Sequence, residues 1–292
     1  MGVPTDIESE RLLVPAARSR LLWRVAPGDA GRRIKLFGLN IENTSVAETG
    51  ATWIAAARAG KKLRAVFANA HVVNELTADS GYRAVVTTAD RVYADGSGMA
   101  VAALLAGQPL QDNVNGTDLF PRLAADAAAA GIKIFLLGGR HGVAAQAQQR
   151  MNDFGLGAGI AGIHHGFFAA GSTEEAAAIA AVNASGADIV LVAMGVPLQD
   201  KWIARNAARL NAPVLVGVGG LFDFFAGTVS RAPHAMRVIG CEWVWRLVLE
   251  PRRMARRYLI GNARFLVLAV AAALHVRRRK ARAAQWQAVR GR

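Results

Sequence analysis

Short apolar runs, many of them rich in β-branched residues, alternate with longer alanine-rich segments along most of the chain. The apolar runs predict buried strands, and the alanine-rich segments predict helices. Because this alternation is typical of parallel strands joined by helical crossovers, we expect an α/β fold with a Rossmann-like, mostly parallel sheet and helices on both faces. The predicted strands lie in RIKLFGLNI (33–41), RAVFANA (64–70), RAVVTTADRVYADG (83–96), IKIFLLGG (132–139), ADIVLVAMGVP (187–197) and APVLVGVGG (212–220).

Helix signals fill the intervals between these strands. Thr44 or Ser45 can cap a helix that ends near Gly60, and four further segments have helical composition: 71–80, 117–131, 141–151 and 199–210. The segment 221–233 has the composition of a loop. Beyond it, 241–250 is predicted to be helical, and Pro251 suits the first turn of a helix that continues to about residue 276. We expect the last residues, 277–292, to form a basic tail.

The positive charge is concentrated at one end of the chain. The protein has 292 residues, 53% of them hydrophobic, and a formal net charge of +14. Residues 231–292 hold fifteen basic residues against two acidic ones, a net charge of +13, whereas residues 1–230 carry only +1. We therefore predict an N-terminal extension (1–32), a near-neutral α/β core (33–240) and a basic, aromatic-containing C-terminal appendage (241–292).

The sequence shows neither a signal peptide nor a membrane-spanning run, which favours the cytoplasmic side of a membrane. The N-terminus lacks the basic and apolar regions of a signal peptide. The longest late apolar run, 265–274, is half of the roughly twenty residues that a spanning helix needs. Cys241 is the single cysteine, which excludes a disulfide framework and fits a reducing compartment.

Polar residues follow several of the predicted strands, where ligands bind in open parallel sheets. Asp95 could accept a proton from a substrate hydroxyl, or it could be an Asp-Gly turn residue. Asp223 could anchor its apolar loop or accept a bond from a sugar hydroxyl. The glycine turns at 138–142 and 217–220 could surround a phosphate or be plain turns. The polar residues of this edge are Asn69, His71, Asp95, Gln199 and Asp223.

No metal site is predicted. The adjacent histidines His164 and His165 rarely point at one ion, and the single cysteine cannot complete a zinc set. None of the twelve aspartates forms an Asp-x-Asp pair. A nucleotide-sugar enzyme built on this chain would need cationic side chains for the departing diphosphate, and the arginines of 246–257 are the densest supply.

The basic C-terminal segment allows three interpretations. It could be a solvated charge run, a nucleic-acid-binding tail or a segment that lies on an anionic membrane. Three of the six tryptophans fall in this segment, interleaved with arginine as in interfacial segments, and the rest of the chain has no nucleic-acid-binding motif. We therefore favour the membrane and expect no nucleic-acid partner.

Six segments occur in an order that resembles the WecG/TagA/CpsF family of bacterial glycosyltransferases. The similarity runs from about Arg33 to Leu259. The segments are DNVNGTDLFP (112–121), FLLGG (135–139), GIHHGFF (162–168), VAMGVPLQDKWI (192–203), GVGGLFDFFAGTVSRAP (217–233) and CEWVWRLVLEPRRMARRYL (241–259).

This resemblance implies an inverting, metal-independent transfer of a hexose from a UDP-sugar, without a cofactor. The acceptor would be a polyprenyl-diphosphate-linked saccharide at the inner leaflet of the cytoplasmic membrane, where the protein would be peripheral. Asp95 would be the catalytic base, Asn69 would line the pocket and Gln199 would contact the donor. The remaining substrate-binding positions would be Thr117, Asp118 and Asp223, with Arg246, Arg253 and Arg256 closing over the diphosphate.

Two departures from the family pattern affect the expected substrate. Phe67 stands where many members have threonine, and Asn113 stands where many have arginine. Both positions lie in the region expected to bind the sugar or the acceptor, so an N-acetylmannosamine specificity does not carry over. The resemblance favours the exopolysaccharide branch, in which a glucosyl residue is added to lipid-linked glucose.

A second hypothesis comes from a different functional class. The chain could be a non-catalytic, nucleotide-responsive binding protein whose basic tail docks on a membrane or on nucleic acid. The sequence leaves the oligomeric state open between a monomer and a homo-oligomer.

Overall fold

The computed structural model describes residues 33–290, with side chains described up to Arg278, so the predicted extension 1–32 lies outside the described residues. An eight-stranded sheet with the order β1-β2-β4-β3-β8-β7-β5-β6 forms its centre, and all neighbours but β1 and β2 are parallel. The predicted α/β fold is confirmed. The strands are β1 (Arg33–Leu36), β2 (Leu39–Glu42), β3 (Leu63–Ala68), β4 (Arg91–Ala94), β5 (Ile134–Gly138), β6 (Ile160–His164), β7 (Ile189–Ala193) and β8 (Val214–Gly217).

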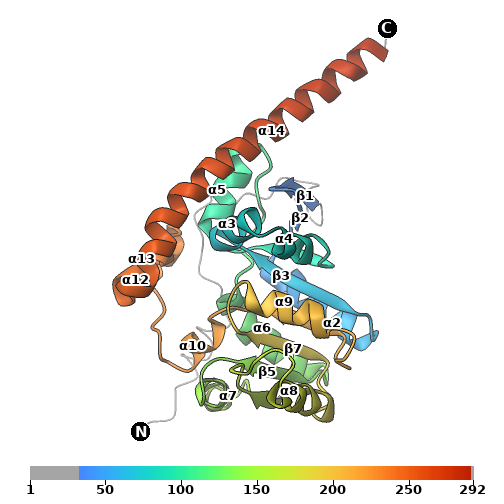
Figure 1. Ribbon diagram of the computed structural model, residues 1–292, viewed down its shortest axis with the longest axis vertical. Helices are drawn as coiled ribbons and strands as arrows, with labels where there is room; N and C mark the ends of the chain where they lie inside the picture. Colours follow the sequence, from blue (N-terminus) through green and yellow to red (C-terminus); the bar gives the residue numbers. More distant parts are fainter. Residues whose placement is uncertain (1–32, 291–292) are drawn as a thin grey trace.

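Helices cover both faces of the sheet (Figure 1). Alternating side chains of the strands form separate cores on these two faces. On β3, Ala65 and Phe67 point to one face, and Val66 and Ala68 point to the other. The first face is covered by α2 (Val46–Arg58), α6 (Gly116–Ala129), α7 (Val143–Asp153) and α10 (Leu221–Phe225). The second face is covered by α3 (Ala70–Ala78), α4 (Ser80–Thr87), α5 (Ser97–Leu105), α8 (Thr173–Ala184), α9 (Leu198–Asn206) and α14 (Gly261–Arg290).

Two of the predicted strands are wrong in their boundaries. Residues 33–41 form a hairpin rather than one strand, because Phe37 and Gly38 both adopt left-handed backbone (φ 56° and 79°) and reverse the chain between β1 and β2. Residues 80–87 form helix α4, so only Arg91–Ala94 of the predicted strand 83–96 is β4. Asp79 explains the helix, since its side chain accepts a bond from Tyr82 N at 2.9 Å and caps α4.

The C-terminal segment is more helical than the sequence predicts. Residues 221–225 form α10 instead of a loop, and the predicted basic tail continues helix α14 to Arg290. In Figure 1 this helix runs along α3 and α5 and then projects beyond the sheet. Before it come α11 (His234–Val238), α12 (Glu242–Leu249), α13 (Pro251–Ala255) and the π-helical turn η1 (Arg256–Ile260), so the helix start predicted at Pro251 is confirmed.

Residues 251–278 are long and apolar enough to cross a membrane by length and composition alone. The uninterrupted apolar run 265–274 is too short to predict such a segment. The longer helical segment passes because it is apolar on average, although it includes charged residues. One face of this helix is nevertheless used within the protein. Phe265, Ala269 and Ala273 are buried in the core formed with α3 and α5.

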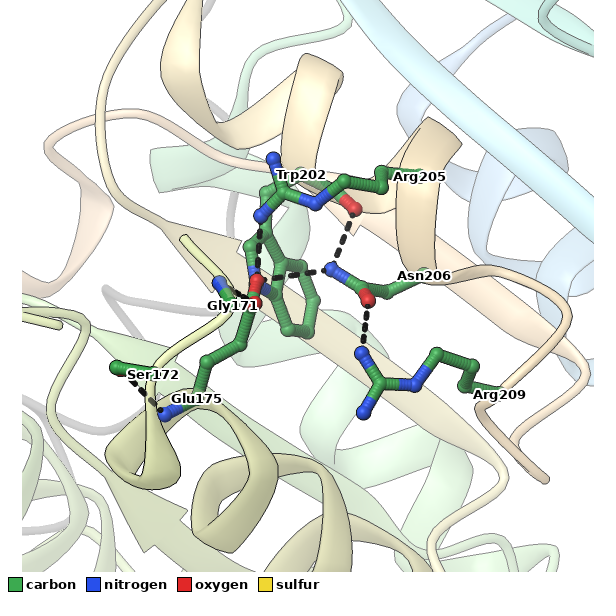
Figure 2. A network of polar contacts seen from close by, with 7 residues as sticks. All are labelled: Gly171, Ser172, Glu175, Trp202, Arg205, Asn206 and Arg209. Carbon is green, nitrogen blue, oxygen red and sulfur yellow. Dashed lines mark hydrogen bonds and ion pairs between the residues drawn. The ribbon is translucent and has the colours of Figure 1, made fainter. Parts of the chain in front are cut away.

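A buried polar network fixes the position of α9 relative to α8 (Figure 2). Glu175 is 1% exposed, and its carboxylate accepts bonds from Gly171 N at 2.5 Å and Asn206 Nδ2 at 3.1 Å. Arg205 donates to the same carboxylate, and Arg209 Nη1 donates to Asn206 Oδ1 at 2.9 Å. Burial alone would raise the pKa of Glu175, but the Gly171 N–H and the Arg205 guanidinium bring it below its usual range.

Replacing Glu175 by Gln is expected to lower the free energy of unfolding at pH 7 by about 2–3 kcal/mol, because the Gln loses the charge that Arg205 and Gly171 stabilise. Since the folded pKa of Glu175 is depressed, its contribution is present above the unfolded pKa and is lost as pH falls through the folded one. The difference in the free energy of unfolding between wild type and variant, measured by urea unfolding, should therefore become smaller from pH 7 to pH 3. Glu174→Gln, in the same helical turn but exposed, is the matched control, and an equal loss in both variants would contradict the assignment.

Candidate active site

Strands β3 and β8 are neighbours, yet the helices that follow them cover opposite faces of the sheet. The chain leaves β3 for α3 on one face and leaves β8 for α10 on the other. In sheets of this kind, ligands usually bind at the carboxyl ends of strands whose following helices diverge in this way. Asn69 follows β3 and the 218–220 turn follows β8, so both lie at this part of the sheet edge, and Asp95 follows the adjacent β4.

Asp95 is held at this edge by two asparagines. Asn69 Oδ1 accepts bonds from His71 N and Val72 N, both at 3.1 Å, and so caps α3. Because Asn69 Oδ1 accepts these two bonds, the other end of the amide, Nδ2, faces Asp95 and donates to Asp95 Oδ2 at 3.1 Å. Asn113 Oδ1 accepts the N–H of Gly96 at 2.6 Å and fixes the loop that follows. The arrangement orients the Asp95 carboxylate, and its role as a proton acceptor stays a prediction.

Charged groups from the C-terminal segment surround Asp95. The guanidinium of Arg257 lies near enough for Asp95 to support its charge, although burial, the larger effect, lowers the pKa of Arg257. Burial also raises the pKa of Glu242; the nearby arginine Arg231 opposes this, while Asp118 and Asp95 add to it. Ser97 Oγ donates to Gly240 O at 2.7 Å, which ties the residue just before the appendage to the loop after Asp95.

His71 also lies within this group of charges. Burial lowers the pKa of His71 to about 4, and the positive charge of Arg257 acts in the same direction. The imidazole is therefore neutral at pH 7. The sequence placed His71 at this edge without a role, and the structure locates it between α3 and the backbone of Val196.

Gln199, Asp223 and Arg246 meet at the glycine turn after β8. Gln199 is 3% exposed, and its Oε1 accepts the N–H of Gly219 at 2.8 Å. Asp223 Oδ2 and the Arg246 guanidinium both lie within 4 Å of the position that a Cβ on Gly220 would occupy. Arg246 also lies over the Phe224 ring at 4.9 Å from its centroid and pairs with Glu250 at 3.3 Å. The structure thus brings these three predicted residues together.

Thr117 and Asp118 are occupied by contacts within the protein. Thr117 Oγ1 donates to Asn115 Oδ1 at 2.7 Å, and Asn115 Nδ2 donates to Asp118 at 2.9 Å. Asp118 is buried and forms an ion pair with Arg231. These contacts hold the first turn of α6 against the segment that follows α10, and a direct contact of either residue with substrate stays a prediction.

The arginines predicted to bind the diphosphate differ in exposure, and only Arg246 lies at the glycine turn in the contacts described above. Arg253 is 57% exposed and pairs with Glu250 at 2.9 Å, and Arg256 is also exposed. Arg257, which the resemblance did not select, lies near enough to Asp95 and His71 for the charges to act on one another. It belongs to the π-helical turn η1 (Arg256–Ile260). Arg257 is therefore the functional candidate that sequence reasoning missed.

Three histidine rings stack at the far end of the same sheet edge. The rings of His141 and His165 are 4.1 Å apart, and those of His164 and His165 are 4.5 Å apart. Within the part of the chain that the structure describes, no group of three or more His, Cys, Asp or Glu is arranged to hold a metal ion.

Comparison with known proteins identifies relatives of the chain. Residues 34–279 match the glycosyl transferase WecG/TagA/CpsF family. The N-acetylglucosaminyldiphosphoundecaprenol N-acetyl-beta-D-mannosaminyltransferases of Staphylococcus aureus strains NCTC 8325 / PS 47 and COL are each 28% identical to it over 227 residues. Each alignment covers 77% of this chain and 87% of the relative.

Proposed function

Because the chain belongs to the WecG/TagA/CpsF family and is a glycosyltransferase, we propose that it transfers a hexose from a UDP-sugar to a polyprenyl-diphosphate-linked saccharide, with inversion at the anomeric carbon. The observation that carries the proposal is the pairing, at one sheet edge, of an oriented carboxylate with an arginine-lined glycine turn. The first group suits activation of an acceptor hydroxyl, and the second suits a leaving diphosphate.

In the proposed reaction, Asp95 takes the proton of the acceptor hydroxyl while that oxygen bonds to the anomeric carbon of the donor. The bond from this carbon to the diphosphate oxygen breaks, and UDP leaves with the electron pair. Arg246 and Arg257 stabilise the developing negative charge without a metal ion. Arg253 and Arg256 remain predicted contacts, but their exposure makes Arg257 the stronger candidate.

Asn69 has a more specific role in this proposal than lining a pocket. Its amide donates to the Asp95 carboxylate, so it orients the base while it caps α3. Gln199 and Asp223 lie at the glycine turn, where we place the donor. The acceptor then approaches from the side of β4 and the appendage.

The donor sugar is the least constrained part of the proposal. The relatives reported above are mannosaminyltransferases by name and act on a diphosphoundecaprenol-linked N-acetylglucosamine, which favours a cell-wall polymer over the exopolysaccharide branch. The same resemblance makes diphosphoundecaprenol-linked N-acetylglucosamine the first acceptor to test. UDP-N-acetylmannosamine and UDP-glucose are the two donors to compare.

The test is release of UDP by the purified full-length protein with each donor, with and without the lipid-linked acceptor. We expect acceptor-dependent UDP release with one of the two donors in the presence of EDTA, since the proposed site uses arginines in place of a metal. Absence of release with all common UDP-hexoses, tested with diphosphoundecaprenol-linked N-acetylglucosamine and with lipid-linked glucose as acceptors, would overturn the proposal.

We also propose that the appendage rests on the anionic inner leaflet without crossing it. The face of α14 opposite its buried side exposes Val267, Val270 and Leu274, spaced as one helical stripe. Exposed arginines flank this stripe at 264, 277 and 278. An exposed apolar stripe bordered by arginines fits an interfacial helix. A membrane-crossing helix would have to withdraw Phe265 from the core of the protein.

Replacing Val267, Val270 and Leu274 together by Ser is expected to weaken binding to phosphatidylglycerol-containing vesicles by at least about tenfold, because each loses apolar contact with the acyl region. Vesicle flotation measures the binding, and circular dichroism checks the fold. Ala51→Ser with Ala55→Ser on the exposed side of α2 is the control. Equal flotation of the triple variant and the wild type would refute this membrane surface.

A further inference from the structure

Tyr82 and Asp200 form a deeply buried polar pair that the proposed reaction does not use. Tyr82 is 0% exposed on α4, Asp200 is 2% exposed in the first turn of α9, and the Tyr82 hydroxyl donates to Asp200 Oδ2 at 2.6 Å. Burial raises the pKa of Asp200 to about 6 and also raises the pKa of Tyr82. Burying an ionised carboxylate lowers the stability of the fold unless the carboxylate has compensating partners, so we ask which groups contact Asp200.

The neighbour of this pair on α9 is Gln199. Burial raises the pKa of Asp200 most strongly, and the Gln199 amide, which lies beside the carboxylate over Gly217, acts in the opposite direction. Gln199 Nε2 and Asp200 Oδ1 both lie over Gly217, where a Cβ would overlap each of them. The last residue of β8 therefore has to lack a side chain for the two groups to lie together.

The carboxylate determines which way the Gln199 amide points. An ionised carboxylate only accepts hydrogen bonds, so the amide NH₂ must face Asp200. The amide oxygen then faces the glycine turn, where Oε1 accepts the N–H of Gly219 at 2.8 Å. The contacts run from the Tyr82 hydroxyl through Asp200 and Gln199 to the backbone of the turn. The Asp200 carboxylate and the Gly219 N–H thus favour the same orientation of the Gln199 amide from its two sides.

We propose that Tyr82 and Asp200 are positioning residues that fix the Gln199 amide and the 218–220 turn for binding the diphosphate of the nucleotide. The inference rests on the proposed function, in which this turn receives the donor. Neither residue contacts the substrate. Their effect is to keep one amide orientation and one backbone conformation in the empty site, so that binding does not have to select them.

A purely structural role would be to hold α4 against α9, and the chain offers a control for it. Lys201 Nζ pairs with Asp79 Oδ2 at 2.6 Å, and Asp79 also caps α4 through the Tyr82 N–H. This second bridge joins the same two helices. It is made by the residue after Asp200 and does not contact Gln199 in the contacts described for it.

The test compares Tyr82→Phe with Lys201→Gln in the full-length protein. Tyr82→Phe keeps the ring and is expected to raise the Kd for UDP, measured by calorimetry, about tenfold, with a similar rise in donor KM and kcat within about threefold. Lys201→Gln is expected to leave the Kd for UDP within about twofold of wild type. Asp200→Asn, which can present either an amide or an oxygen to Gln199, is expected to act like Tyr82→Phe.

Thermal unfolding of the variants separates positioning from stability. A rise in Kd for UDP in Tyr82→Phe at a melting temperature no lower than that of Lys201→Gln supports positioning. An unchanged Kd in Tyr82→Phe and Asp200→Asn, or an equal rise in Lys201→Gln, overturns it. UDP binding is measured without turnover, so this result is distinguishable from failure of the proposed function, in which the wild type itself releases no UDP.

Discussion

Asp95→Asn is expected to lower kcat by on the order of a hundredfold or more while leaving the Kd for UDP unchanged. The substituted amide has the shape of the carboxylate, and its oxygen can still accept the bond from Asn69 Nδ2. What it loses is the capacity to take a proton from the acceptor hydroxyl, and such transfers contribute about 10²–10⁴ to enzyme rates. Single-turnover transfer to the lipid-linked acceptor measures this step apart from product release.

The control for this prediction is Asp126→Asn. Asp126 lies on the surface of α6 and pairs with Arg122 at 3.4 Å, away from the sheet edge. Its replacement removes the same charge and should leave kcat within about twofold of wild type. If Asp95→Asn retained the wild-type rate, the assignment of Asp95 as base would be wrong, and Glu242 would become the carboxylate to test next.

The sheet could be predicted from sequence because its strands carry a strong local signal. β5, β7 and β8 are continuous apolar runs that end in glycine or a short turn, and buried parallel strands have this pattern. The errors fall where a single polar residue or turn outweighs the pattern. Asp79 starts α4 inside an apparent strand, and Phe37 adopts a left-handed conformation that its residue type disfavours.

The site could be predicted as a set of loops but not as a set of contacts. The carboxyl ends of the strands place Asn69, Asp95 and Gln199 at one edge, as the alternating pattern implies. Their hydrogen-bond partners come from distant parts of the chain. Tyr82 lies 118 residues before Asp200, and no periodicity relates two positions so far apart. The ion pair between Asp118 and Arg231 likewise joins two positions that lie far apart in the sequence.

The arginines show why a resemblance can select the wrong neighbour. The resemblance assigned Arg246, Arg253 and Arg256 to the diphosphate and left out Arg257. A π-helical turn begins at Arg256, and in such a turn the angle between successive side chains departs from the regular step of about 100° per residue. The two adjacent arginines therefore differ in environment: Arg256 is exposed to solvent, and Arg257 faces Asp95 and His71.

Arg257→Gln is accordingly expected to lower kcat about a hundredfold, since it removes a cation that lies close to the reacting groups and is shielded from water. The adjacent variant, Arg256→Gln, has the same chemistry and the same helical propensity cost, and should stay within about threefold of wild type. Acceptor-dependent UDP release at saturating donor measures both variants.

A second consequence distinguishes stabilisation of the leaving group from general electrostatic attraction. Burial and the charge of Arg257 both lower the pKa of His71, so removing that charge should raise the His71 pKa, which NMR titration of the imidazole can follow in wild type and variant. The Arg256 variant should leave the His71 titration unchanged. If Arg256→Gln instead caused the larger loss of kcat, and the His71 titration moved with it, the arginine selected by the resemblance would be right and the assignment of Arg257 would be wrong.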